Sequence, residues 1–270
     1  MYELEYVKKR KRRRRVAIIG GISTVVVSTL CIVAFLGRYV GTFTVSLDTG
    51  NVKLALSLKS TFETSTSFLR VDNMPLFREY TYGSFEELGH DVIDNEETTT
   101  NDLAGNYDGG FLTSVNFFKY TFYVKNVGDS PARYTFQMNI LDLHEATDGS
   151  HRTLEDSLRV MIYDNADLSK HDKTVYGKKS AIPHDDGQGG KDYRAPVTVD
   201  DPDDPEFYGY AEMFNSSSVV TTLSVPKIVS GEIRRYTIVM WLEGFRSSYV
   251  EEAPEGATMK LGVEINGYGI

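Results

Sequence analysis

The pattern of apolar and polar residues divides the chain into one long uncharged segment near the N terminus and a series of short alternating segments after it. The uncharged segment runs from Val16 to Gly37 and contains no Asp, Glu, Lys or Arg. A helix rises about 1.5 Å per residue, so this segment reaches roughly 30 Å, the thickness of the hydrocarbon core of a bilayer. The pattern therefore predicts a single transmembrane helix over residues 16–37.

Beyond the uncharged segment, apolar residues recur at every second position, which is typical of β-strands. Within Val52–Leu58, for example, Val and Leu share one face and Lys, Ala and Ser share the other, which predicts one side on a core and one side facing water. The predicted strands are Val40–Leu47, Val52–Leu58, Phe118–Val124, Tyr134–Ile140, Leu158–Tyr163, Thr174–Tyr176, Ser218–Val225, Ile233–Glu243 and Thr258–Asn266.

These short strands, with turn residues between them and no long helix, predict a mainly β domain over residues 38–270. The expected architecture is an antiparallel β-sandwich or jelly roll. Its centre is expected at Phe118–Val124 and Tyr134–Ile140, which flank the turn Asn126–Pro131 and are predicted to form a hairpin. Thr153–Asp156 predicts a short helical turn.

Two stretches rich in Asp, Glu, Thr and Gly, near residues 72–110 and 184–206, predict irregular surface insertions. The second contains carboxylates of the kind that bind Ca²⁺, but Pro205 stands at a ligand position of an EF-hand loop and the next residue replaces its required glycine. Two interpretations stay open, a solvated acidic loop and a weak calcium site. The candidate ligands are Asp200, Asp201, Asp203, Asp204 and Glu206.

A run of basic residues directly precedes the uncharged segment, and it sets the predicted topology. Basic residues next to a spanning helix stay in the cytoplasm, so residues 1–15 are predicted to be cytoplasmic and residues 38–270 extracellular. This is the topology of a single-pass protein of the cell membrane with an uncleaved signal anchor. The topology-determining residues are Lys8, Lys9, Arg10, Lys11, Arg12, Arg13, Arg14 and Arg15.

A cleaved secretory signal is the alternative to an uncleaved anchor, because signal peptides also begin with positive charge. Their apolar region is usually about 7–15 residues long and ends at a small-residue cleavage site. The present segment is longer, and Ala34–Arg38 offers no clean site. The uncleaved anchor is therefore favoured, and removal of residues 1 to about 40 remains the alternative.

The charge of the chain is distributed unevenly. Residues 1–15 carry a net +6, so the rest of the chain carries −15 against −9 for the whole. Such an acidic domain repels nucleic acid, and the topology of the anchor already explains the basic run, so no nucleic-acid partner is predicted. The single cysteine, Cys31, lies in the predicted membrane segment, which leaves the exported domain without disulfides.

No constellation of catalytic residues is recognisable in the sequence. A zinc-protease helix requires His-Glu-x-x-His, whereas His144-Glu145 is followed by Asp148 at the second histidine position and then by Gly149. No Gly-x-Ser-x-Gly elbow or phosphate-binding glycine loop is present. The sequence therefore predicts a protein that is not an enzyme.

Three strand motifs and the order of the segments resemble those of a known family. The segments YTFYVKNVG (Tyr120–Gly128), LRVMIY (Leu158–Tyr163) and YTIVMWLEG (Tyr236–Gly244) follow a basic N terminus and one hydrophobic segment. In these features the chain resembles the exported β-sandwich proteins of Gram-positive bacteria related to camelysin and the TasA-type biofilm-matrix proteins. The resemblance implies a jelly-roll domain on the cell surface.

In some of those relatives the domain is a subunit of extracellular fibres whose first strand pairs with a neighbouring copy. In this chain the corresponding stretch would be Val40–Leu58. Three functions follow, of which the first is favoured: a membrane-anchored structural or adhesive surface protein that associates through exposed strand edges, a secreted matrix-fibre subunit, and a camelysin-like surface metalloprotease.

Overall fold

The computed structural model describes residues 39–75, 79–80, 117–147, 149–165, 173–181, 183–185, 188–198, 207–243 and 256–270. The predicted cytoplasmic tail and the predicted helix over residues 16–37 lie outside these ranges. Among the described residues, no helix has the length and apolar content of a membrane span. The chain divides into a unit of residues 1–39 and a second unit of residues 40–270, and only the second is described below.

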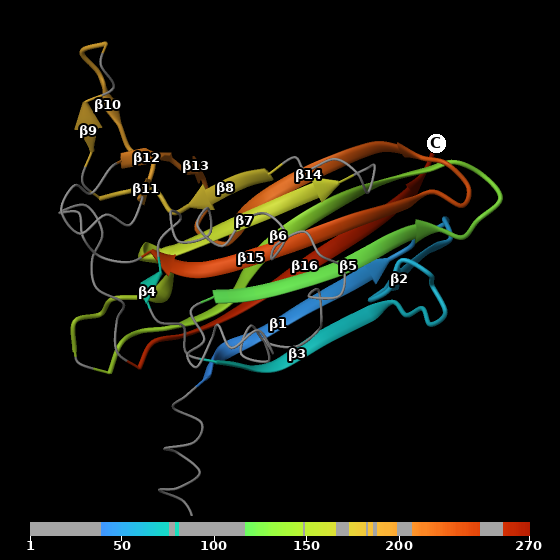
Figure 1. Cartoon of the computed structure of the whole chain (residues 1–270), viewed down its shortest axis with the longest axis horizontal. Coiled ribbons are helices and arrows are strands. Elements are labelled where there is room, and N and C mark those ends of the chain that lie inside the picture. The colour runs from blue at the N-terminus through green and yellow to red at the C-terminus, as the bar shows by residue number, and fades with distance from the viewer. Residues whose placement is uncertain are drawn as a thin grey trace, which may run out of the picture. The chain divides into compact units, whose positions relative to one another are not determined.

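The domain is mainly β, as predicted, and its longer strands form two sheets (Figure 1). The five-stranded sheet has the order β14-β6-β16-β1-β3. Its strands are β1 (Tyr39–Asp48), β3 (Phe68–Pro75), β6 (Ala132–His144), β14 (Val219–Ile228) and β16 (Thr258–Gly269).

The seven-stranded sheet has the order β13-β8-β7-β15-β5-β2, and β4 also pairs with β15. Its strands are β2 (Leu54–Ser57), β4 (Glu79–Tyr80), β5 (Phe117–Asn126), β7 (Leu158–Asn165), β8 (Lys173–Gly177), β13 (Glu212–Met213) and β15 (Ile233–Glu243). The predicted helical turn is the 3-10 helix η2 (Leu154–Asp156) just before β7.

The two sheets pack face to face around an aromatic core. The ring of Phe43 on β1 lies 5.3 Å from that of Tyr120 on β5, and the ring of Phe136 on β6 lies 4.7 Å from that of Tyr236 on β15. Tyr134 and Tyr236 share a buried hydrogen bond of 2.8 Å between their hydroxyl groups. Burial of these large side chains from both sheets is the main stabilising contribution to the sandwich.

The predicted hairpin over residues 118–140 is wrong, although both strands and their place in the core are confirmed. β5 pairs with β15 and β2, whereas β6 pairs with β16 and β14. The connecting turn therefore crosses from one sheet to the other. The physical reason is that each strand has its own apolar face, and the two faces bury most area when they oppose each other across the core, as the stacked rings of Phe122 and Phe136 do.

The expectation of purely antiparallel sheets also needs correction. Most pairs are antiparallel, but β1 runs parallel to β16, β13 to β8 and β4 to β15. The N-terminal strand thus lies beside the C-terminal strand along the register Gly41↔Met259 to Asp48↔Asn266. Parallel pairing is possible here because the two strands are far apart in sequence and need no tight turn between them.

The outer face of the seven-stranded sheet is covered, contrary to the expectation that the second face of Val52–Leu58 meets water. Ala55 and Ser57 of β2 are buried together with the residues of the opposite face. On β5 and β15 the outward positions Thr121 and Thr237 are also buried, and their hydroxyl groups share a hydrogen bond of 2.7 Å. These strands are therefore enclosed on both sides, which explains their near-continuous apolar sequences.

The two predicted irregular insertions contain more regular structure than expected. The first begins with the end of β3 and with β4, and the second contains β9 (His184–Asp185), β10 (Lys191–Asp192) and β11 (Pro196–Thr198), which pairs with β12 (Phe207–Tyr210). Such short strands lack the alternation by which longer ones are recognised. Residues 81–110, 186–187 and 199–206 lie outside the described residues.

Gly41→Ala is expected to destabilise the domain by about 1–3 kcal/mol. Gly41 has a φ of +152°, and a methyl group at this position would overlap the carbonyl oxygen of Met259 on β16. Denaturant unfolding followed by circular dichroism measures the loss. Gly269→Ala is the matched control, since a methyl group there meets nothing within 4 Å. Equal stability of the two variants would contradict the close approach of β1 to β16.

Candidate functional site

The residues singled out in the sequence for metal binding and topology lie outside the described part of the chain. This applies to the candidate calcium ligands between residues 200 and 206 and to the basic run over residues 8–15. Within the described residues, no group of three or more His, Cys, Asp or Glu side chains is placed to hold a metal ion. Both assignments therefore stay predictions.

The pair His144-Glu145, which opens like a zinc-protease motif, lies where strand β6 ends. His144 is near Asp142, with 3.4 Å between Nε2 and a carboxylate oxygen, and Glu145 pairs with His151 at 2.6 Å. The hydrogen bond that His151 donates to the carboxylate of Glu145 raises the pKa of His151 above its ordinary value. Because the motif is not on a helix, its side chains do not have the one-turn spacing on which zincin chemistry depends.

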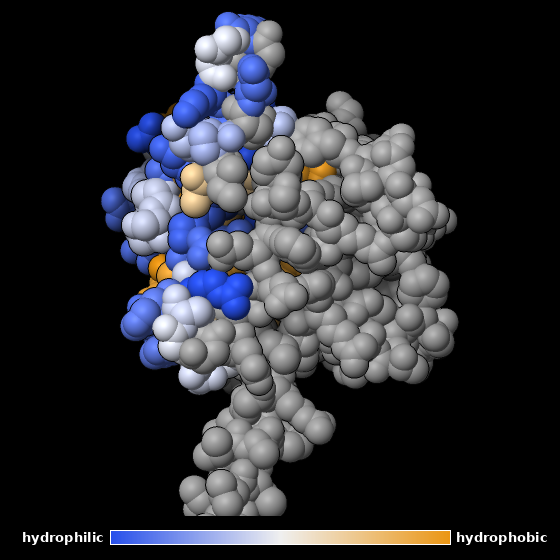
Figure 2. Space-filling model, turned by 90° about the vertical axis from the view of Figure 1, so that its left-hand side faces the viewer, coloured by the Kyte–Doolittle hydropathy of each residue, from blue (hydrophilic) through white to orange (hydrophobic). Residues whose placement is uncertain are grey.

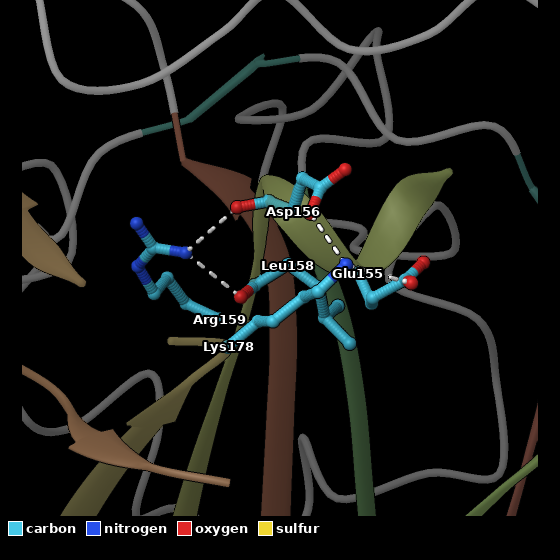
Figure 3. A network of polar contacts seen from close by, with 5 residues as sticks. All are labelled: Glu155, Asp156, Leu158, Arg159 and Lys178. Atoms are coloured by element: carbon cyan, nitrogen blue, oxygen red, sulfur yellow. Dashed lines mark hydrogen bonds and ion pairs between the residues drawn. The ribbon is translucent and has the colours of Figure 1, made fainter. Parts of the chain in front are cut away.

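A charged network lies beside η2, where β7 and β8 run together (Figure 3). Lys178 Nζ lies 3.0 Å from a carboxylate oxygen of Glu155 and 2.7 Å from one of Asp156. Arg159 Nη1 donates to the carbonyl oxygen of Leu158 at 2.9 Å and reaches that of Asp156 at 3.5 Å. These contacts fix the 3-10 turn to the sheet, so we assign the network a structural role.

Arg159 is buried on the outer face of the same sheet, where its charge interacts with that of Glu243. Its side chain is 1% exposed, and burial lowers its pKa while the charge of Glu243 opposes that effect. Glu243 is also buried and accepts a hydrogen bond of 2.9 Å from the indole N–H of Trp241. Trp241 is a packing residue, because it lies in a buried cluster with Phe117, Met161, Tyr163, Ala195, Val197, Ala211 and Val239.

The small β9–β10 hairpin forms a hydrophilic projection at the edge of the domain (Figures 1 and 2). At its base Lys179 Nζ lies 4.4 Å from the ring centre of Tyr193, and Arg194 lies 5.2 Å from that of Tyr210. Arg194 also pairs with Asp192 at 2.6 Å. The positive charges of Lys179 and Arg194 thus have partners at the base of the hairpin. The exposed tip around residues 188–191 is typical of a solvated loop.

The exposed strand edges predicted as association sites differ in how open they are. At one edge of the five-stranded sheet, β14 carries the exposed residues Pro226 and Lys227 and two irregularities in its register. Proline, lysine and bulges all disfavour the addition of another strand. β2 is short and forms a bridge from Leu56 to Thr66. The other long edge strand among the described residues is β3, at the opposite edge of the five-stranded sheet. It is therefore the strand at which the predicted association with a partner chain is expected.

A cleft of about 380 Å³ lies at the end of the five-stranded sheet where β1 and β16 finish. The register places Asp48 beside Asn266, and Tyr268 opposite Arg133 of β6, with all four side chains on the outer face of the sheet. The β1–β2 turn closes one side, and its backbone is held by a hydrogen bond of 3.1 Å from Gly50 N–H to Asp48 Oδ1. The lining residues are Asp48, Gly50, Asn51, Arg133, Asn266, Gly267, Tyr268 and Gly269.

The same end of the domain exposes apolar side chains. The turn after β5 and the turn after β14 lie together here, because Gly231 N–H donates to the carbonyl oxygen of Asn126 at 2.8 Å. A polar cleft beside exposed apolar groups is a combination found at recognition surfaces. The exposed apolar residues at this end are Val127, Val229, Tyr268 and Ile270.

Comparisons with protein-family models, with curated proteins and with solved structures gave no match. The resemblance to the camelysin and TasA-type proteins is therefore carried by the short motifs alone. One of these motifs has a clear structural basis. Asn126 in YTFYVKNVG is buried, and its side chain donates to the carbonyl oxygens of Ser130 and Ile228 and accepts a hydrogen bond from Gly128 N–H.

Sequence reasoning missed the cleft, because its residues come from segments far apart in the chain. Asp48 belongs to a turn signal, Arg133 to the start of one strand and Tyr268 to the end of another. None of them forms a local motif. A signal was present in the polar residues that alternate with the core residues of β1 and β16, but only the parallel pairing brings those residues together.

Proposed function

We propose that this chain is a membrane-anchored cell-surface protein with a structural or adhesive, non-catalytic role. The observation that carries the proposal is the cleft beside exposed apolar side chains at the end of β1. β1 begins at Tyr39, directly after the predicted membrane segment, and its ten residues extend over about 30 Å to Asp48. The cleft thus lies at the opposite end of β1 from Tyr39.

Cysteine labelling on intact cells tests the proposed topology. In a Cys31→Ser background, a membrane-impermeant maleimide is expected to label Asn51→Cys, whose side chain is exposed beside the cleft. The matched variant Glu3→Cys, in the predicted cytoplasmic tail, should react only after lysis. Labelling of Glu3→Cys on intact cells, or protection of Asn51→Cys, would refute an extracellular domain behind a cytoplasmic N terminus.

A secreted fibre subunit of the TasA type is the second candidate, supported by the place where the folded domain starts. The boundary between the two units of the chain falls after residue 39, close to the end of a cleaved signal at about residue 40. Cleavage there would leave almost all of β1 in the sheet. In that case the family resemblance implies a jelly-roll topology and the pairing of Val40–Leu58 with a neighbouring copy, for which β1 would have to leave its place between β16 and β3.

A camelysin-like metalloprotease is the least supported of the three functions, because His144-Glu145 lies at the end of a strand. Purified full-length protein is expected to leave a casein substrate intact with or without added zinc. Calcium is expected at most to raise the thermal midpoint of unfolding, through the aspartates between residues 200 and 206. Chelator-sensitive cleavage of casein would instead support the protease.

A further inference from the structure

The cleft at the end of the five-stranded sheet presents hydrogen-bonding groups of both kinds. The amide side chains of Asn51 and Asn266 can donate and accept, and the second carboxylate oxygen of Asp48 can accept. A sugar hydroxyl also donates and accepts at the same atom. Convergent amide and carboxylate groups therefore match a ligand with several adjacent hydroxyls better than they match an apolar ligand.

Tyr268 adds an aromatic surface to these polar groups. Its side chain is 46% exposed although it is paired within β16, and it lies directly across from Arg133 in the sheet. A half-exposed aromatic ring stacks favourably on the C–H face of a pyranose while its hydroxyl group remains in water. The ring and the amides of the cleft thus supply the two kinds of contact that a sugar ring needs.

Arg133 selects the charge of the ligand. Its guanidinium lies 5.8 Å from the ring centre of Tyr268, and it makes no ion pair with a carboxylate in the described part of the chain. A guanidinium that is stacked on an aromatic ring is held in place, and its free edge can bind a carboxylate or a phosphate through two parallel hydrogen bonds. The geometry favours a sugar that carries an acidic group.

The sheet surface next to the cleft continues the same chemistry. The outward positions of β1 and β6 are hydroxyl and amide residues, including Thr44, Ser46, Thr135 and Gln137, all partly exposed. These four side chains are uncharged, but the exposed carboxylate of Glu264 on β16 lies between Ser46 and Gln137, so this strip favours a neutral sugar unit over a second acidic one. This strip gives a saccharide chain a path beyond the cleft.

From these observations we infer that the cleft binds an acidic saccharide, with its carboxylate or phosphate on Arg133 and a sugar ring on Tyr268. The inference deepens the adhesive part of the proposed function and rests on it only for the cellular setting. Asp48 and the two asparagines orient the hydroxyls. The overall negative charge of the domain makes binding weaker at low ionic strength, since the ligand is also an anion.

The test uses the purified full-length chain in detergent on an array of oligosaccharides that carry uronic acid, sialic acid or phosphate, each beside its neutral counterpart. Binding to at least one acidic class is expected, with its neutral counterpart bound at least tenfold more weakly. Calorimetry on the best ligand then compares variants. Arg133→Met and Tyr268→Ala are each expected to weaken binding at least tenfold.

Lys260→Met is the matched control for Arg133→Met, because it removes one exposed positive charge from β16 at the end far from Tyr268. It should leave the affinity within about twofold. The replaced side chains are all exposed, so unchanged thermal unfolding can verify that the variants fold. Absence of binding to every acidic class, equal binding of neutral counterparts, or equal loss in the control would overturn the inference. None of these outcomes depends on where the protein resides in the cell.

Discussion

Arg159→Met is expected to lower the free energy of unfolding by about 3–5 kcal/mol. The substitution removes the positive charge that interacts with the charge of Glu243, and it leaves that carboxylate buried on the outer face of the seven-stranded sheet. It also removes the hydrogen bond to the carbonyl oxygen of Leu158. Denaturant unfolding at neutral pH, followed by circular dichroism, measures the loss.

The control for this prediction is a double-mutant cycle. Glu243→Gln keeps an acceptor for the indole N–H of Trp241 but removes the negative charge. The double variant is therefore expected to be more stable than the sum of the two single losses predicts, by about 1–3 kcal/mol. Additive losses within about 0.5 kcal/mol would mean that the two charges do not interact across the sheet.

Asn126→Ala is expected to destabilise the domain by about 3–4 kcal/mol, through the loss of three buried hydrogen bonds. The side chain of Asn126 connects the turn after β5 with the end of β14, so its removal leaves the carbonyl oxygens of Ser130 and Ile228 without this donor. The thermal midpoint should fall by about 2–4 °C for each kcal/mol in a domain of this size.

Two comparisons separate the role of the Asn126 side chain from general effects of substitution. Asn126→Asp keeps the acceptor for Gly128 N–H but loses both donors, so it should recover little of the stability. Asn51→Ala removes an exposed amide at the same end of the domain and should change stability by less than about 0.5 kcal/mol. A mild effect of Asn126→Ala, close to that of Asn51→Ala, would show that the two turns do not depend on this residue.

Period-two alternation located the long strands well, because each one buries a continuous apolar face in the core. The segments around Phe122, Phe136 and Ile238 are strands in the structure, as predicted. Alternation does not determine which strand lies beside which, so the sequence predicts a hairpin around the turn at residues 126–131, where the chain in fact crosses between the sheets. The Asn and Gly residues of this turn suit both a hairpin within one sheet and a connection between the two sheets. The connection between sheets is favoured by the aromatic packing across the core.

The outward-facing residues were harder to predict than the core. Lys119, Arg159 and Glu243 are charged, and charged residues are usually exposed, yet all three are buried on the outer face of the seven-stranded sheet. That face is covered in part by Ala195, Val197 and Ala211, which lie in or directly beside β11 and β12, and these two strands are too short to show a pattern of their own. The cleft was beyond prediction for a related reason, because the neighbours Asp48 and Asn266 are brought together only by parallel pairing of the first and last long strands.

In the function proposed above, the domain stays attached to the membrane by the segment over residues 16–37. Intact-mass measurement of the protein recovered separately from the membrane pellet and from the medium of a Gram-positive expression host tests it most directly. If the anchor is uncleaved, a full-length species of 30.3 kDa confined to the membrane is expected. A shorter species in the medium that begins between residues 37 and 44 would contradict it, and would make a secreted matrix subunit the better description.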